Sequence, residues 1–164
     1  SRANVRIDFK PYPEEYRRFT EPSLATTYAS NSENITVVSS SVDARFIIQD
    51  YQMLITSGAT STLGWAFASN KPLIFINWKA HLPINPPLAE EFSNALFYFD
   101  GDATDFHEEL RYFLEKDIAE IRELWDARKT NRSAFCNKYI SEKTRKVGGL
   151  IADEIQGFVN SCRR

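Results

Sequence analysis

The stretch of this sequence best suited to chemistry is the run Ser57-Gly-Ala-Thr-Ser-Thr62. It combines Gly58, which permits a positive φ, and Ala59 with the four hydroxyls of Ser57, Thr60, Ser61 and Thr62. An apolar helix is predicted to start at its end, where the first amides have no partner within the helix and the helix dipole is positive. Such a turn attracts phosphate. The alternative is that the hydroxyls only cap the helix, because caps are more common than ligand sites.

Two short apolar runs are predicted to position this turn. A strand over 53–56 precedes it, a helix over 62–69 follows, and a second strand over 73–76 comes after a Lys-Pro pair. Short runs rich in Ile, Leu and Phe on either side of a helix indicate a parallel βαβ unit. Similar patterns predict strands over 5–10, 34–38 and 96–99, and helices over 14–19, 22–30, 42–49 and 87–94.

This alternation of strands and helices predicts an α/β fold with an open, doubly wound parallel (Rossmann-like) sheet. Ser39 to Ser41 are expected to cap the helix over 42–49. From Asp102 onward, apolar residues recur at three- and four-residue spacing, which is typical of helices. We therefore expect a Rossmann-like domain over residues 1–116 and C-terminal helices over 117–164, packed on the same domain.

Ligands of a doubly wound sheet bind outside the carboxyl ends of its strands. The loops that start at Lys10, Ser39, Ser57 and Asn77 each follow a predicted strand, so we expect them to converge there. Lys10 could add positive charge for a phosphate, or could be a lysine in water at a strand end. His81 lies in the last of these loops, where an exposed histidine is the alternative to a functional one. No Ser/His/Asp ordering, metal-ligand cluster or Walker-type lysine is present in the sequence.

The charge of the chain is unevenly distributed. Residues 1–127 hold 11 Lys/Arg and 19 Asp/Glu, a net charge of −8, whereas residues 128–164 hold 9 and 3, a net charge of +6. The basic tail could contact an anionic membrane or nucleic acid, or could be a solvated helix face. Cys136 and Cys162 have no metal or redox spacing, which favours reduced thiols in a cytosolic protein. Because the chain runs from Ser1 into a strand without an initiator Met, we expect a fragment of a longer protein.

The segment from Asp50 to Asn77 resembles the nucleotide-sugar-binding half of GT-B glycosyltransferases, particularly bacterial capsule, lipopolysaccharide and teichoic-acid transferases. In that family a strand ending in Thr or Asp leads to a small-residue turn, a helix, Lys-Pro and a buried strand. This sequence carries Leu-Ile-Thr-Ser-Gly-Ala-Thr-Ser-Thr-Leu over 54–63, Ala66, and Lys-Pro-Leu-Ile-Phe-Ile over 71–76. Residues 9–13, Phe-Lys-Pro-Tyr-Pro, resemble the family's Lys-Pro-His-Pro motif. The likeness covers roughly residues 5–115.

The resemblance implies that residues 57–62 hold the phosphates of an activated sugar or polyol, with Lys10 beside them. Tyr12, Ser40 and His81 are the further expected donor contacts. Two departures leave the donor open and allow an inactive member. Tyr12 stands where the family motif has histidine, and Trp65 stands where many GT-B proteins have a glutamate that grips the ribose.

Two functions follow from these residues and this resemblance. The first is the donor domain of a metal-independent GT-B transferase, whose acceptor site and base lie in a further N-terminal domain. It would use a nucleotide-sugar as substrate, need no cofactor, bind no nucleic acid, and work in the cytoplasm or peripherally at the inner membrane. The second is a non-catalytic nucleotide- or phosphate-binding or interaction module that keeps the fold and has lost the chemistry.

Overall fold

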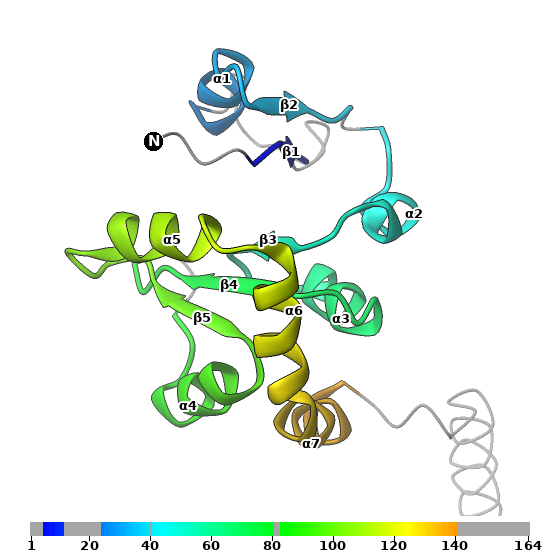
Figure 1. Ribbon diagram of the computed structural model, residues 1–164, viewed down its shortest axis with the longest axis vertical. Helices are drawn as coiled ribbons and strands as arrows, with labels where there is room; N and C mark the ends of the chain where they lie inside the picture. The colour runs from blue at the N-terminus through cyan, green and yellow to red at the C-terminus, as the bar shows by residue number, and fades with distance from the viewer. Residues whose placement is uncertain (1–4, 12–23, 40, 81–82, 141–164) are drawn as a thin grey trace, which may run out of the picture.

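The fold is an α/β arrangement of short parallel strands and helices (Figure 1). The computed structural model describes residues 5–11, 24–39, 41–80 and 83–140. Its strands are β1 (Ile7–Phe9), β2 (Ile35–Val37), β3 (Leu54–Thr56), β4 (Leu73–Asn77) and β5 (Phe97–Asp100). Its helices are α1 (Leu24–Ser30), α2 (Ala44–Ile47), the 3₁₀ turn η2 (Ile48–Asp50), α3 (Ser61–Ala68), α4 (Pro86–Ala95), α5 (Phe106–Leu114), α6 (Ile118–Ala127) and α7 (Lys129–Tyr139).

The strands form two sheets, whereas the sequence predicted one. β1 pairs with β2, and β3, β4 and β5 pair in that order, all in parallel. Figure 1 shows the first pair set apart from the three-stranded sheet. A side-chain bond joins the two, because the Tyr51 hydroxyl donates to Asp8 Oδ2 at 3.1 Å. In the described part of the chain no backbone ladder joins the two sheets.

One face of the three-stranded sheet is covered by α3, α4 and α7. Phe75 of β4 meets Phe92 of α4 edge-on, with ring centroids 4.9 Å apart. Phe135 of α7 contacts Phe92 at 4.9 Å and stacks on Phe67 of α3 at 5.1 Å. Because side chains alternate between faces, Asn77 and Phe75 point to the same side. This aromatic chain ties three helices to the centre of the sheet.

The opposite face is covered by α5 and α6. Phe97 of β5 lies 4.6 Å from Phe113 of α5 and 5.6 Å from Trp125 of α6, between ring centroids. Phe99, two residues on, contacts the same Phe113. Helices on both faces make this sheet doubly wound, as the alternation of elements predicted. The fully buried side chains Leu73, Ile74, Phe75 and Leu96 lie at its centre.

One local prediction, the serine cap of α2, is wrong. The cap of α2 is Asp43, whose Oδ1 accepts the Arg45 amide at 2.8 Å, and not a serine of 39–41. Asp43 caps this helix because its carboxylate lies directly before the first helical residue and also binds the Arg45 side chain. Gly58 has no positive φ, since no glycine among the described residues does. The turn after β3 is therefore made without the conformation that only glycine adopts easily.

The predicted helix over 14–19 and most of the basic tail, from residue 141 on, lie outside the described residues. Within the described part, no helix is both long and apolar enough to cross a bilayer. Two basic residues of α7 have structural partners. Arg132 is 6% exposed, and Lys138 pairs with Glu91 of α4. These two cations hold helices together within the domain.

Candidate functional site

The turn between β3 and α3 is open to solvent at the carboxyl end of β3. Ser57, Ala59 and Thr60 are exposed, and Gly58 and Thr62 are half-buried. Thr60 is the N-cap residue of α3 in an extended conformation, but its side chain makes no capping hydrogen bond. Its carbonyl accepts the Leu63 amide at 3.0 Å. Thr60 is thus not the cap that the alternative interpretation needs, and the first amides of α3 have no partner within the helix.

α3 is held in place by its body and its far end, so its first turn does not have to be capped. Leu63, Ala66 and Phe67 are buried in the core. The C-terminal end is closed by Asn70, whose φ of 56° is left-handed and whose amide donates to the Phe67 carbonyl at 3.1 Å. The helix is therefore anchored in the core although Thr60 gives it no side-chain cap.

A buried polar side chain lies at the same edge of the sheet. Asn77 ends β4 and is 3% exposed. Burial raises the pKa of Tyr98, and the polar side chain of Asn77 opposes that rise. The Oδ1 atom of Asn77 has no hydrogen-bond partner in the part of the chain that is described. The sequence interpretation missed this residue, although a polar residue closing the apolar run 73–77 was a visible signal.

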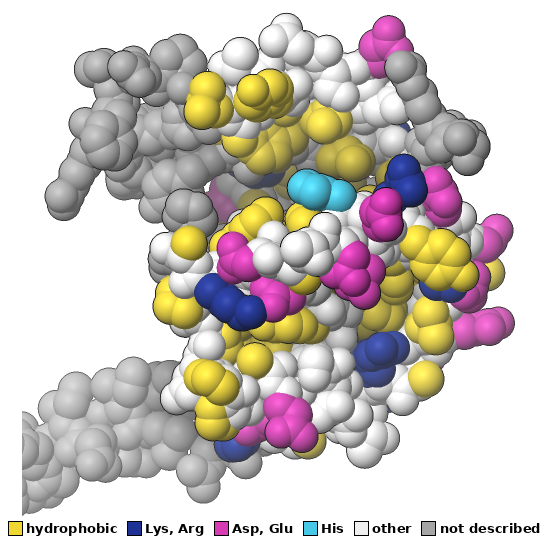
Figure 2. Space-filling model, turned by 90° about the vertical axis from the view of Figure 1, so that its left-hand side faces the viewer, with side chains coloured by type: hydrophobic (Ala, Val, Ile, Leu, Met, Phe, Trp, Pro, Cys, Tyr) yellow, Lys and Arg dark blue, Asp and Glu magenta, His cyan; other side chains and the backbone are white. Residues whose placement is uncertain are grey.

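The carboxyl end of β5 is held by charge and by close packing. Lys79 pairs with Asp100, and its amide donates to Asp102 Oδ2 at 2.8 Å. The hydrogen bond from Lys79 lowers the pKa of Asp100. Gly101 lies so close to Trp78 that an added Cβ would be 2.6 Å from Cδ2 of the indole. Figure 2 shows this side of the molecule, where acidic side chains lie beside basic ones.

Lys10 lies near the start of α2. Its ammonium donates to the Pro11 carbonyl at 3.1 Å. The pKa of Asp43 is lowered mainly by its hydrogen bonds with Arg45, and Lys10 adds a smaller attraction. The Arg45 guanidinium in turn lies 5.0 Å from the Trp65 ring centroid in α3. Arg45 thus connects the start of α2 with α3, and Lys10 adds a weak electrostatic attraction to Asp43.

The remaining sequence-predicted contacts are not placed. Tyr12, Ser40 and His81 lie outside the described residues, and so does the side chain of Ser61. Ser61 itself is the first residue of α3. The residues that the structure does bring together at the carboxyl edge are therefore those of the β3–α3 turn and Asn77.

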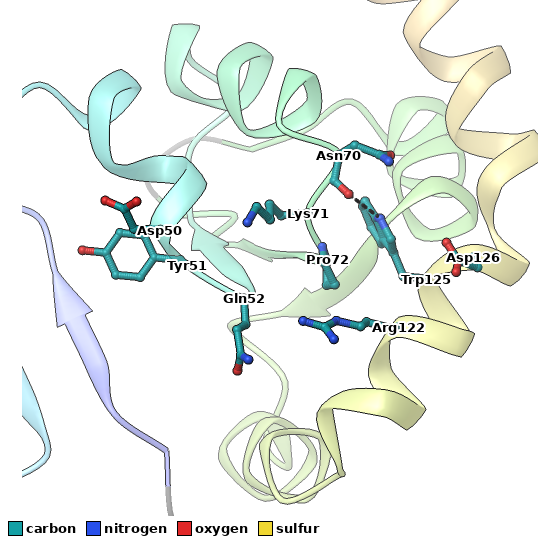
Figure 3. A pocket seen from close by; sticks show the side chains of 9 residues that line it. All are labelled: Asp50, Tyr51, Gln52, Asn70, Lys71, Pro72, Arg122, Trp125 and Asp126. Atoms are coloured by element: carbon teal, nitrogen blue, oxygen red, sulfur yellow. Dashed lines mark hydrogen bonds between the residues drawn. The ribbon is translucent and has the colours of Figure 1, made fainter.

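A pocket of about 310 Å³ lies at the opposite, amino edge of the sheet (Figure 3). The Trp125 indole donates to the Asn70 carbonyl at 3.2 Å, and the Lys71 ammonium donates to the Gln49 carbonyl at 2.7 Å. Asp50 lies at this end of the sheet and not at the carboxyl edge. The lining residues are Asp50, Tyr51, Gln52, Asn70, Lys71, Pro72, Arg122, Trp125 and Asp126.

Comparison with known proteins identifies no family for this chain. No protein-family model matches the chain, and no curated protein and no solved structure matches it significantly. The fold itself defines the class: an α/β protein with parallel strands and helices, compatible with a Rossmann-like domain. Its function has to be argued from the site.

Proposed function

We propose that this chain binds the phosphates of a nucleotide-sugar at the β3–α3 turn, as the donor domain of a metal-independent GT-B-type glycosyltransferase of surface-polysaccharide synthesis. One observation carries the proposal. The N-terminus of α3 lies at the carboxyl end of a parallel strand, and its N-cap residue Thr60 makes no capping bond. Unpaired amides and the positive end of a helix dipole are the usual means by which such folds hold phosphate.

The turn would act on the leaving group of the transfer. An acceptor hydroxyl oxygen forms the new bond to the anomeric carbon, the bond from that carbon to the phosphate oxygen breaks, and a general base takes the hydroxyl proton. The amides of α3 would stabilise the charge that develops on the departing diphosphate. The base and the acceptor site would be supplied by a further N-terminal domain. Lys10, at the carboxyl end of β1, would add positive charge near the donor.

A titration followed by amide NMR tests this proposal. UDP-, GDP- and CMP-type ligands and inorganic pyrophosphate are added in turn to the labelled chain. We expect the amides of residues 57–62 to shift with at least one nucleotide and with pyrophosphate. If none of these ligands moves them, the proposal fails. A transferase assay on a longer protein that carries the N-terminal domain would then test catalysis.

A non-catalytic binding module is the second candidate, and Trp65 favours it. Where many GT-B proteins have a ribose-gripping glutamate, this chain has an indole covered by the Arg45 guanidinium at 5.0 Å. An indole has no carboxylate that could accept hydrogen bonds from the hydroxyls of a ribose. Nucleotide binding together with no transfer in the longer protein would select this second function.

A further inference from the structure

The helix α2 presents an aromatic ring to solvent. Phe46 is 79% exposed, the highest value among the large apolar side chains of the described residues. No residue of α2 is buried. A single exposed apolar side chain is common on protein surfaces, so its surroundings decide whether it has a role. Here the neighbour is Arg45, whose guanidinium carbon lies 6.0 Å from the Phe46 ring centroid.

The Arg45 side chain is held in one orientation and is still accessible. Its Nε and Nη2 atoms donate to Asp43 Oδ2 at 3.0 and 2.6 Å, and its side chain remains 55% exposed. The guanidinium also lies 5.0 Å from the Trp65 ring centroid in α3. Because a guanidinium is planar and stacks on aromatic faces, Arg45 joins two rings into one accessible surface. We call this surface, formed by Arg45, Phe46 and Trp65, the α2–α3 platform.

The α2–α3 platform lies next to the proposed phosphate site. Trp65 follows Ser61, the first residue of α3, by about one helical turn. Side chains of a helix lean toward its N-terminus, so the indole covers the turn of helix before its own Cα. The Arg45 guanidinium therefore lies across one indole from the start of α3. In a nucleotide one ribose separates the base from the phosphates, so phosphates held at the β3–α3 turn leave the base near this platform.

The chemistry of the α2–α3 platform selects a flat and uncharged occupant. Asp43 compensates the charge of Arg45, and its hydrogen bonds with Arg45 lower the pKa of Asp43. A phosphate would therefore gain little net attraction at this surface. Aromatic rings and arginine planes are, by contrast, the surfaces on which proteins stack nucleobases, because every base has a π-face. A base that covers the exposed Phe46 ring also removes apolar surface from water.

We propose that the base of the bound nucleotide stacks on the α2–α3 platform, so that this surface distinguishes a nucleotide from bare pyrophosphate. The inference rests on the proposed function, since the β3–α3 turn must first hold the phosphates. Trp65 then has a role different from that of a glutamate that grips the ribose. Its indole supports the Arg45 guanidinium beside which the base lies.

Titration calorimetry with three ligands tests the α2–α3 platform. UDP, GDP and inorganic pyrophosphate are titrated into the wild type and into three variants. We expect Phe46→Ala to weaken about tenfold each nucleotide that binds the wild type, and to leave the Kd of pyrophosphate within about twofold. Phe46→Tyr keeps the ring and should bind as the wild type does. Tyr112→Ala is the matched control, because it removes a ring that is 70% exposed from α5 on the opposite face of the sheet.

The outcomes separate the two proposals. If neither pyrophosphate nor a nucleotide binds the wild type, the proposed function fails and the platform falls with it. If pyrophosphate binds and nucleotides bind no more tightly, only the platform is overturned. The same conclusion follows if Phe46→Ala leaves nucleotide affinity unchanged or weakens pyrophosphate equally. Self-association of the wild type that Phe46→Ala abolishes, at unchanged nucleotide affinity, would assign the ring to a protein contact instead.

A readout on the wild type needs no variant at all. The ring resonances of Phe46 should shift when UDP or GDP is added and stay in place with pyrophosphate. Shifts of equal size with pyrophosphate, or none with a nucleotide that binds, would overturn the platform.

Discussion

The two edges of the three-stranded sheet differ in how their hydrogen-bonding groups are used. At the amino edge a pocket is present, yet the indole of Trp125 and the ammonium of Lys71 donate to carbonyls of the chain itself. At the carboxyl edge Thr60 makes no side-chain cap for α3, and Oδ1 of Asn77 has no hydrogen-bond partner among the described residues.

The amino edge also has the tighter internal packing. Arg132 of α7 donates to the Trp125 carbonyl, and its guanidinium lies 3.8 Å from the indole ring centroid. Burial lowers the pKa of Arg132, as expected for a cation among apolar groups. Trp125 thus joins α6, α7, β5 and the end of α3, and we interpret this edge as the structural one.

The largest expected loss of stability comes from a substitution at the amino edge. Trp125→Ala removes a buried ring that contacts Phe97 and leaves the Asn70 carbonyl without its donor. We expect a loss of about 3–5 kcal/mol in the free energy of unfolding, measured by urea denaturation. Trp125→Phe, which keeps most of the ring packing, should cost much less. A small loss for Trp125→Ala would contradict the structural role of this edge.

The next largest loss of stability should come from a substitution at the carboxyl edge. Gly101→Ala places a Cβ against the Trp78 indole, where 2.6 Å leaves no room. We expect about 1–3 kcal/mol of destabilisation by urea denaturation, because overpacking forces the ring or the strand end to move. Pyrophosphate binding should weaken as well if the two strand ends form one site. Asp102→Ala is exposed and serves as a control for the same loop, with a smaller effect on stability.

A third change should separate binding from stability at the β3–α3 turn. Ser61→Pro removes one helix N-terminal amide, and proline fits the first helical position after an extended residue such as Thr60. We expect pyrophosphate affinity to fall about tenfold, roughly 1.4 kcal/mol, with stability changed by less than about 0.5 kcal/mol. Ser61→Ala keeps the amide and should bind normally. Equal affinities for the two variants would remove this amide from the site.

The smallest effect should lie away from both edges, at the contact between α4 and α7. Lys138 is exposed, and its hydrogen bond with Glu91, helped by Tyr139, raises the pKa of Lys138 to about 12. The same bond from Lys138 lowers the pKa of Glu91. A raised lysine pKa stabilises fully below the ordinary value of 10.5 and is lost as pH rises through about 12. A lowered glutamate pKa stabilises above 4.5 and is lost as pH falls through the native value.

Thermal unfolding across pH measures this contact. Glu91→Gln should flatten the dependence below pH 4.5 and above 10.5 relative to the wild type, while ligand binding at neutral pH stays unchanged. Because the pair is exposed, added salt should reduce the difference. A pH dependence identical to that of the wild type would show that the pair does not contribute.

The strands and helices near the candidate site were predictable because their signals are local. The strand predicted over 73–76 is observed as Leu73–Asn77, and the helix predicted over 62–69 as Ser61–Ala68. Runs of buried apolar residues bounded by glycine, serine or proline indicate such elements wherever they lie in a chain. The position of the turn between β3 and α3 follows from the same signals.

The capping hydrogen bonds and backbone conformation of that turn were not predictable. Whether Thr60 caps its helix depends on the φ and ψ of one residue and on the direction of one hydroxyl, and the sequence allows both outcomes. Likewise, Asp43 in place of a serine caps α2, and Gly58 has no positive φ. Each of these depends on backbone dihedral angles that neighbouring elements impose.

Composition and hydrophobic spacing alone specify an α/β chain with short parallel strands, a small-residue turn before α3 and an amphipathic helical end, because these features depend on neighbours in sequence. Only the tertiary structure divides the strands into two sheets and buries Arg132 against Trp125. It also leaves Oδ1 of Asn77 without a hydrogen-bond partner among the described residues. These outcomes depend on how strands and helices pack against one another, and hydrogen-bond satisfaction is decided only when their faces meet.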